Sequence, residues 1–288
     1  MAPPKNAMTV KLLDLVPQYE SIRDEIREAI DEVLSTQQFI LGKKVEALEA
    51  EIARYCGVRW AAGVASGSDA ILLSLMGLGI GAGDEVITTP YTFFSTVSSI
   101  TRLGATPVFV DIDPHSMTMD PHALEQYLIG AGDAQPKAVV PVHLYGHPAN
   151  LPRIGAIAQT HGMTVIEDCA QAHGATIRGQ RVGTFGAAAA FSFYPTKNLG
   201  AIGDGGAVAT SNPGLAEQVR LLRQYGWRQR YVSESPGKNS RLDELQAAIL
   251  RVKLARLDAD NQHRRALAGE YRRRLSGARL ELPAILPG

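Results

Sequence analysis

Apolar side chains recur three and four residues apart near the start of the chain. They stand at Tyr19, Ile22, Ile26, Ile30 and Val33. This spacing places them on one face of a helix, so the pattern predicts an amphipathic helix that opens the chain. The same spacing at Val45, Leu48 and Ile52 predicts a second helix after a short turn.

From residue 61 onward, short apolar runs alternate with helical patterns. Such runs, bounded by turn-forming residues, are typical of β-strands. They lie at residues 61–66, 85–90, 106–112, 138–146, 164–170, 187–193 and 205–210. The alternation of strands and helices predicts an α/β fold with a mostly parallel sheet.

Helix signals return after the last of these runs. Asn212 and Pro213 form an N-cap and a first-turn proline, and Ser240 with Asp243 forms a capping-box pattern. An apolar stripe follows at Leu242, Leu245, Ile249 and Val252, and it continues after a charged interval at Leu267, Tyr271 and Leu275. We expect long helices here.

Composition limits what the chain can be. Its 288 residues are 45% hydrophobic, which is enough for a substantial core. The 29 basic and 29 acidic residues cancel, so no net charge favours nucleic acid or an anionic membrane. Cys56 and Cys169 form neither a disulfide framework nor a metal cluster, and no apolar run is long enough to span a bilayer or form a signal peptide. We expect a soluble, cytoplasmic protein without a metal site.

Lys197 follows an apolar strand and precedes a glycine-rich stretch, in FSFYPTKNLGAIGDGG. A lysine between buried strands loses hydration, which disfavours its ammonium form and supplies the free amine that attacks an aldehyde. A solvated loop lysine is the alternative, and for an isolated lysine it is the more common case. Lys197 is therefore a candidate whose role depends on a partner.

Asp168 supplies that partner at the end of the nearly apolar strand in TVIEDCAQAHGA. The carboxyl ends of strands border the ligand crevice in open α/β sheets, so Asp168 and Lys197 can face one site. A buried carboxylate opposite a pyridine nitrogen keeps that nitrogen protonated, and the protonated ring stabilises carbanions. A helix cap is the alternative for Asp168, but it is less favoured in combination with Lys197.

The segment GVASGSDAILLSLMGLG combines a strand, a Gly-Ser turn and a helix. Free N–H groups at the helix start, close approach at Gly67 and a hydroxyl from Ser66 or Ser68 would form a phosphate cradle. A capping box of Ser66 and Asp69 explains the same residues. The later GLGIGAGDE follows a helix and precedes a strand, the reverse of a dinucleotide-binding glycine motif, so we interpret it as a helix-ending turn.

These segments, in this order, resemble those of the DegT-type sugar aminotransferases, fold-type I enzymes that use pyridoxal 5′-phosphate (PLP) on nucleotide-linked keto sugars. The resemblance extends over nearly the whole chain and includes PYTFFSTVSSITRLGATPVFVDID, PVHLYG and GKNSRLDELQAAIL. It implies a three-layer fold around a mostly parallel, seven-stranded sheet. It also implies PLP as the cofactor, with glutamate and a nucleotide sugar as substrates.

The resemblance assigns roles to single residues. Lys197 matches the lysine that forms a Schiff base with PLP, and Asp168 matches the partner of the pyridine nitrogen. Gln171 matches a residue near the phenolic oxygen of the ring. Phe93 matches the aromatic side chain that covers the ring face, although from the residues alone a core position beside Phe94 is an equal alternative.

Four further matches concern the phosphate. Gly67, Ser68 and Ser192 match phosphate contacts, and Asn239 matches a residue that reaches the phosphate held by the neighbouring subunit, which implies a symmetric homodimer. From the residues alone, Ser192 is also an ordinary strand serine and Asn239 an ordinary residue before a helix. His173 and Cys169 receive no role, since a lone histidine and a small buried thiol are more often structural.

Some relatives carry histidine in place of this lysine and dehydrate their substrates, so Lys197 favours transamination. The expected reaction moves an amino group from glutamate to the cofactor and then to the keto sugar, with the displaced lysine shuttling the proton. Another fold-type I PLP enzyme, such as a decarboxylase or lyase, is an alternative, and so is a non-catalytic PLP-binding or regulatory module. A nicotinamide-dependent enzyme is set aside because its glycine motif is missing.

We expect two domains. Residues 1–225 would form the large PLP-binding domain, including the N-terminal helices, and residues 226–288 the start of a small C-terminal domain. Family members usually continue beyond the point that corresponds to ELPAILPG. We therefore expect the small domain, and with it part of the pocket that selects the sugar, to be incomplete in this chain.

Overall fold

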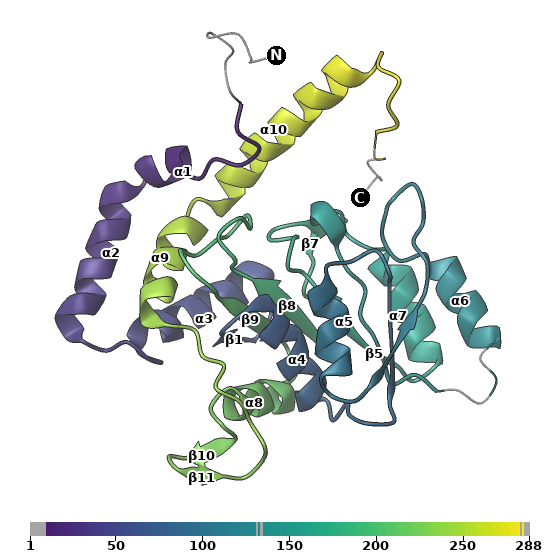
Figure 1. Ribbon diagram of the computed structural model, residues 1–288, viewed down its shortest axis with the longest axis horizontal. Helices are drawn as coiled ribbons and strands as arrows, with labels where there is room; N and C mark the ends of the chain where they lie inside the picture. The colour runs from purple at the N-terminus through teal and green to yellow at the C-terminus, as the bar shows by residue number, and fades with distance from the viewer. Residues whose placement is uncertain (1–9, 131, 133–134, 283, 285–288) are drawn as a thin grey trace, which may run out of the picture.

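The structure is a computed structural model that describes residues 10–130, 132, 135–282 and 284. In this part of the chain a seven-stranded sheet forms the centre, with the strand order β1-β9-β8-β5-β4-β2-β3 (Figure 1). Its strands are β1 (Trp60–Val64), β2 (Glu85–Thr88), β3 (Thr106–Phe109), β4 (Ala138–Val139), β5 (Thr164–Asp168), β8 (Ala188–Ser192) and β9 (Gly206–Thr210). Each overlaps one of the seven predicted strands, so these predictions are confirmed.

Strand direction follows from the pairing. Strands β3, β2, β4, β5 and β8 pair in parallel, whereas β9 is antiparallel to both of its neighbours, β8 and β1. Strand β1 therefore points the same way as β8, and the mostly parallel sheet is confirmed. The carboxyl ends of β1, β5 and β8 consequently lie at one edge of the sheet.

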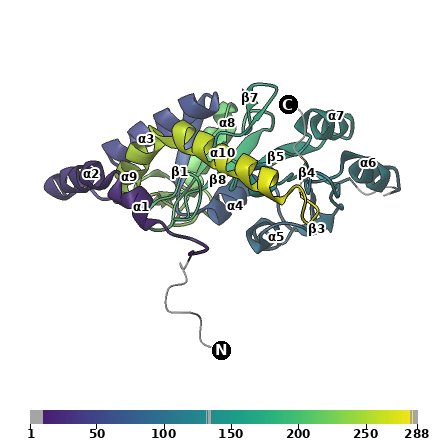
Figure 2. The same ribbon diagram turned by 90° about the horizontal axis from the view of Figure 1, so that it is seen from above.

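Helices cover both faces of the sheet and complete three layers (Figure 2). One face carries α4 (Gly67–Gly77), α5 (Phe94–Thr101) and α8 (Pro213–Leu222). The other carries α3 (Lys43–Cys56), α6 (Pro121–Gly130), α7 (Leu151–Thr160) and α9 (Glu244–Leu254). In β8, Ala188 and Ala190 face the first group, while Ala189 and Phe191 face the second, as the two-residue period of a strand requires.

Two of the predicted caps are confirmed. The Ser66 hydroxyl accepts the N–H of Asp69 at 3.1 Å at the start of α4. The Asn212 side chain accepts the N–H of Leu215 at 3.1 Å, with Pro213 in the first turn of α8. These local signals are readable from sequence because cap and helix are only three residues apart.

The extent of the first helix differs from the prediction. The opening helix is divided into α1 (Val16–Glu20) and α2 (Arg23–Thr36), because Ile22 leaves helical geometry and packs with Ile26 against Ile249 of α9. In the C-terminal region, where long helices are expected, the structure has α9 and α10 (Leu257–Leu275). Leu257 is buried in the same hydrophobic core as Phe191 of β8, while Leu267 and Tyr271 of α10 are exposed.

The predicted capping box at Ser240 is wrong. The Ser240 hydroxyl accepts the N–H of Ala65 at 3.2 Å, which ties the chain to the end of β1, and α9 begins only at Glu244. The buried carboxylate of Glu244 accepts N–H groups at the start of α3, from Gly42, Lys44 and Val45 at 2.8–2.9 Å. An anion at a helix N-terminus is stabilising, so Glu244 fastens α9 to α3.

Short elements surround the sheet. They are the hairpin of β6 (Thr176–Ile177) and β7 (Gln180–Arg181), the hairpin of β10 (Trp227–Gln229) and β11 (Val232–Ser233), and the 3₁₀ turn η1 (Leu144–Gly146). The turn η1 follows β4 at the carboxyl edge of the sheet, and it borders the site described next.

Candidate active site

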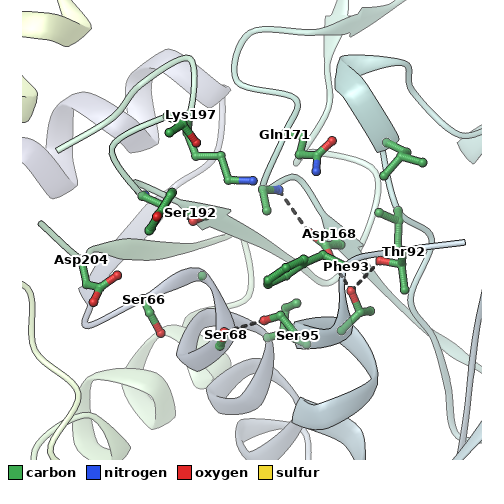
Figure 3. Close-up of a pocket in the computed structure, with 18 of the residues that line it drawn as sticks. Ser66, Ser68, Thr92, Phe93, Ser95, Asp168, Gln171, Ser192, Lys197 and Asp204 are labelled. Carbon is green, nitrogen blue, oxygen red and sulfur yellow. Dashed lines mark hydrogen bonds between the residues drawn. The ribbon is translucent and has the colours of Figure 1, made fainter. Parts of the chain in front are cut away.

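A cavity of about 480 Å³ opens at the edge of the sheet where the carboxyl ends of β1, β5 and β8 meet (Figure 3). Its lining includes seven of the eight residues predicted for the site: Gly67, Ser68, Phe93, Asp168, Gln171, Ser192 and Lys197. Segments far apart in the sequence are brought together because the strands before them end at the same edge.

The start of α4 forms one end of the cavity. Gly67 packs so closely on β8 that a Cβ atom there would lie 2.5 Å from the Cβ of Ser192. Gly206 is similarly constrained, since its Cβ would collide with the backbone of Ser66. The N–H groups of the first helical turn and the hydroxyls of Ser68 and Ser192 therefore border one narrow polar space, which suits an anion.

Asp168 ends β5 and is only 5% exposed. Its Oδ2 accepts the hydroxyl of Thr96 at 2.8 Å, and its Oδ1 accepts the N–H of Ala170 at 3.1 Å. Burial raises the pKa of Asp168, while these two hydrogen bonds and then the charge of Lys197 oppose that rise. Within the described residues the carboxylate has no ion-pair partner, so a cationic ligand atom in the cavity would stabilise it.

Lys197 extends into the cavity from the turn after β8, with its amine on the side of Gln171 (Figure 3). We find no hydrogen bond or ion pair of this amine to the part of the chain that the structure describes. Burial lowers the pKa of Lys197, and the charge of Asp168 works in the opposite direction. Lys197 therefore offers more free amine near neutral pH than an exposed lysine does.

Gln171 is oriented by the backbone of η1. Its Oε1 accepts the N–H of Tyr145 at 2.7 Å, which leaves Nε2 as a donor toward the cavity (Figure 3). Tyr145 holds a left-handed backbone with φ 56° and ψ 19°. This conformation is uncommon for residues other than glycine and is often found at functional sites.

The first turn of α5 connects three parts of the cavity. Phe93 is the N-cap residue and is 71% exposed, as is its neighbour Phe94 at 75%, so the alternative of a core position for Phe93 does not hold. The hydroxyl of Ser95 bonds that of Ser68 in the first turn of α4. Thr96 donates to Asp168. One helical turn thus carries Phe93 and contacts both the polar space at the start of α4 and the carboxylate.

Sequence reasoning missed part of the lining. The omitted residues include Thr92, Ser95, Thr96, Tyr194, Thr196 and Asp204. A signal for two of them was present, because Thr92, Thr96 and Ser99 follow each other at four and three residues, the spacing of a polar helix face, although α5 itself begins only at Phe94.

Asn239 does not line the cavity. It is exposed in the segment before α9, where it forms an isolated β-bridge with Gln224. Its predicted contact requires a second subunit, so its role stays a prediction.

A buried cluster of His143, Glu167 and Cys169 lies behind the cavity. Glu167 accepts the N–H groups of Gly183, Phe185 and Gly186 at 2.6–2.8 Å. The Nδ1 of His143 accepts the N–H of Ala149 at 3.0 Å, so its Nε2 carries the proton and donates to Glu167 at 3.3 Å.

These ring and carboxylate atoms are committed to hydrogen bonds within the fold, and burial raises the pKa of the Cys169 thiol. The cluster therefore has the character of a structural support behind Asp168 rather than of a metal site.

His173 is buried against the rings of Phe191 and Phe193, at centroid distances of 5.5 and 6.1 Å. Neither of its ring nitrogens has a hydrogen-bond partner among the described residues, although the backbone of Ser192 is near enough to affect its charge slightly. Burial lowers the pKa of His173 to about 3, so the ring is neutral at physiological pH.

A three-layer fold with a lysine, a buried carboxylate and a glycine-serine helix start around one strand-end cavity has the architecture of the fold-type I class of enzymes. Residues 20–287 match the DegT/DnrJ/EryC1/StrS aminotransferase family, and the chain belongs to this family.

Curated relatives are similar over nearly the whole chain. A dTDP-3-amino-3,4,6-trideoxy-α-D-glucose transaminase of Streptomyces venezuelae is 49% identical over 276 residues, which cover 96% of this chain and 71% of the relative. A UDP-N-acetyl-3-dehydro-α-D-glucosamine 3-aminotransferase of Acidithiobacillus ferrooxidans is 48% identical, with 97% and 74% covered.

Solved structures have the same fold. S. venezuelae DesV in complex with a ketimine intermediate superposes with a TM-score of 0.93 at 49% identity, covering 96% of this chain and 74% of that one. NtdA from Bacillus subtilis with bound cofactor PMP superposes with a TM-score of 0.88 at 32% identity, covering 98% and 65%. None of the helices in the described residues is both long and apolar enough to cross a membrane.

Proposed function

We propose that this protein uses PLP held at Lys197 to transfer an amino group from glutamate to a nucleotide-linked keto sugar. The observation that carries the proposal is the meeting of a partly desolvated amine and a buried carboxylate at one strand-end cavity. The names of the two relatives, which specify dTDP-linked and UDP-linked sugars, support the substrate class.

The cavity fits the phosphate end of PLP at the start of α4. A dianionic group there would meet the N–H groups of the first helical turn and the hydroxyls of Ser68 and Ser192. Gly67 keeps this space open only because it lacks a side chain, since a Cβ would press on Ser192. The cradle is therefore built for close approach of backbone to ligand.

The ring end of PLP fits the opposite part of the cavity. Asp168 would meet the ring nitrogen, and that nitrogen, when protonated, would provide the cation that the buried carboxylate lacks. The Nε2 of Gln171 would donate to the phenolic oxygen, and the Phe93 ring would cover one face. Lys197 would hold the carbonyl carbon through Nζ.

Bound PLP supplies an electron-accepting ring, which lets a proton leave the carbon that carries the transferred nitrogen. The residues of this chain would govern that proton. The amine of Lys197, once free of the cofactor, would take the proton at Nζ and return it to a neighbouring carbon, and burial favours its free-base form by lowering its pKa. Asp168 keeps the ring nitrogen protonated throughout.

We also propose that the protein is a homodimer with shared sites. Large aromatic side chains are exposed at the cavity and next to it in sequence: Phe93 and Tyr194 line it, and Tyr91, Phe94 and Tyr145 each adjoin a lining residue. Clustered apolar surface of this kind is typical of an interface. A partner subunit seated there would bring its own exposed Asn239 toward the phosphate cradle, which explains why Asn239 lies outside the cavity of its own chain.

The domain division is a further proposal. Residues 226–288 would begin a small domain whose first helix, α9, is fastened in the large domain by Glu244. Residues 283 and 285–288 of this range lie outside the described residues.

An absorbance titration with PLP tests the function. The wild type should develop a band that Lys197→Ala lacks, while Lys137→Ala serves as a control because Lys137 is exposed and pairs with Asp84. Glutamate should bleach the band of the wild type and transfer its nitrogen. Absence of any Lys197-dependent band would overturn the proposal, and a band that no amino donor changes would indicate a PLP-binding module instead.

A further inference from the structure

The hydroxyl of Thr96 behaves differently from three other hydroxyls of α5, although that of Ser95 also bonds outside the helix, to Ser68. Those of Ser98, Ser99 and Thr101 donate back to carbonyl oxygens of their own helix, as serine and threonine in helices commonly do. Thr96 is fully buried, and its Oγ1 bonds instead to the Oδ2 of Asp168 at 2.8 Å. The Thr96 hydroxyl therefore serves the carboxylate rather than the helix.

The direction of these hydrogen bonds follows from the chemistry of an ionised carboxylate. It can only accept, so Thr96 donates to Asp168. The lone pairs of the Thr96 oxygen then accept from the hydroxyl of Thr92, whose oxygen lies 2.8 Å away. The result is a chain of hydrogen bonds, half-buried at Thr92 and buried at Thr96, in which Thr92 donates to Thr96 and Thr96 donates to Asp168. Such linked hydrogen bonds polarise one another and so strengthen one another.

We propose that Thr96 is a positioning residue, which holds Asp168 as an ionised carboxylate oriented toward the ring nitrogen of the cofactor. The consequence for the cofactor rests on the proposed function, whereas the state of the carboxylate does not. Burial works against ionisation, and among the groups that oppose burial the Thr96 hydroxyl has the largest effect.

The other groups around Asp168 do not replace Thr96. From β5 and its following turn come the N–H of Ala170 on Oδ1 and the neutral thiol of Cys169. His143, after β4, donates its backbone N–H to the carbonyl of Asp168 while its ring is engaged by Glu167. Lys197 acts only through its charge. Oδ2, the atom bonded by Thr96, has no second donor among the described residues.

The test measures the carboxylate directly in protein without cofactor. Aspartate labelled with ¹³C at the side-chain carboxyl is introduced, and the Asp168 signal, assigned by its loss in Asp168→Asn, is followed against pH. Thr96→Val removes the hydroxyl and keeps the branched shape, so the midpoint of Asp168 should rise by about one unit or more. Thr96→Ser keeps a hydroxyl and should restore a midpoint near that of the wild type.

Thr101→Val is the matched control, because it makes the same substitution on the same helix at an exposed hydroxyl that, among the described residues, bonds to the carbonyl of Ser98 alone. It should leave the Asp168 midpoint unchanged. If Thr96→Val does not fold, Thr96→Ala removes the same donor with less steric demand. An unchanged midpoint in a folded variant that lacks the hydroxyl overturns the inference, as does a Thr96→Ser midpoint that matches Thr96→Val.

A second measurement follows the cofactor. With PLP labelled with ¹⁵N in the ring, the nitrogen signal should move toward its unprotonated position in Thr96→Val and return in Thr96→Ser. A raised Asp168 midpoint without any PLP binding would contradict the proposed function and leave the inference on Thr96 intact. Normal PLP binding with an unchanged titration midpoint of Asp168 in Thr96→Val would contradict the inference on Thr96 and leave the proposed function intact.

Discussion

Gly67 at the start of α4 rests directly on Ser192 at the end of β8, so that a single added methyl group would lie 2.5 Å from one side-chain carbon of Ser192 and 3.1 Å from its Cα. The neighbours here are backbone and a buried strand residue, which cannot move aside easily. The spacing between α4 and β8, and with it the width of the phosphate cradle, is therefore set by the absence of a side chain at residue 67.

Gly67→Ala should weaken cofactor binding. Overpacking of this kind costs about 1–3 kcal/mol, so we expect the dissociation constant of PLP to rise about tenfold and the melting temperature to fall. Gly155→Ala is the control, because Gly155 lies within α7 and has open space around its Cβ position. That variant should be neutral or slightly stabilising. Equal PLP affinity in Gly67→Ala and wild type would contradict the packing argument.

The sequence predicted the parts of the site that depend on strand ends. Asp168 and Lys197 follow apolar strands, and parallel strands must end at a common edge. Thr96 was not predicted, because which of the four buried or half-buried hydroxyls of α5 reaches a carboxylate depends on how α5 packs against β5. Ser240 shows the opposite error. Its local sequence predicted a helix cap, but its hydroxyl accepts the N–H of Ala65, which is far away in the sequence.

The backbone of Tyr145 was equally beyond prediction. Nothing in its local sequence requires a left-handed conformation, which is held by the hydrogen bond to Gln171 and by the following Gly146. Sequence patterns thus predicted which segments meet, whereas the orientation of single donors required the assembled fold.

Lys197 should titrate below an ordinary lysine. Burial lowers its pKa and Asp168 raises it, so Asp168→Asn should lower the pKa of Lys197 further. NMR of ¹³C-dimethylated lysines, with the signal assigned by Lys197→Ala, measures both shifts. Asp84→Asn is the control, since Asp84 pairs with Lys137. A Lys197 midpoint at or above the usual value would be inconsistent with this site.

The lowered pKa of Lys197 also determines how the free energy of unfolding changes with pH. Between the lowered pKa of folded Lys197 and the ordinary value of the unfolded chain, the unfolded state binds more protons. Lys197 should therefore make the free energy of unfolding rise with pH between these two pKa values. Lys197→Met should remove this contribution to the pH dependence of stability.

His173 should make the protein sensitive to acid. Its pKa is about 3 in the fold against 6.5 in the unfolded chain, so the unfolded state binds the extra proton between these values and stability falls as pH drops below about 6.5. The expected loss between about pH 7 and about pH 5 is about 2 kcal/mol. Urea denaturation at a series of pH values measures it.

His173→Phe should reduce this loss of stability at acid pH. The ring nitrogens have no hydrogen-bond partner among the described residues, and Phe191 and Phe193 already surround the ring, so an apolar ring is compatible with the site. His263→Phe, at an exposed position of α10, should lose as much stability at acid pH as the wild type does. Equal acid sensitivity in His173→Phe and wild type would show that another group causes it.

Mixed dimers would test whether Asn239 serves the site of the partner subunit. Lys197→Ala and Asn239→Ala variants should each bind PLP poorly, the first for lack of the amine and the second for lack of a phosphate contact across the interface. When the two are unfolded together and refolded, about half of the dimers should be mixed, and each mixed dimer contains one site with both residues intact. At a PLP concentration that fills intact sites but not defective ones, about a quarter of the wild-type absorbance band should then return. If Asn239 acted within its own chain, every site in the mixture would lack one residue or the other, and no band beyond the sum of the separate variants would appear.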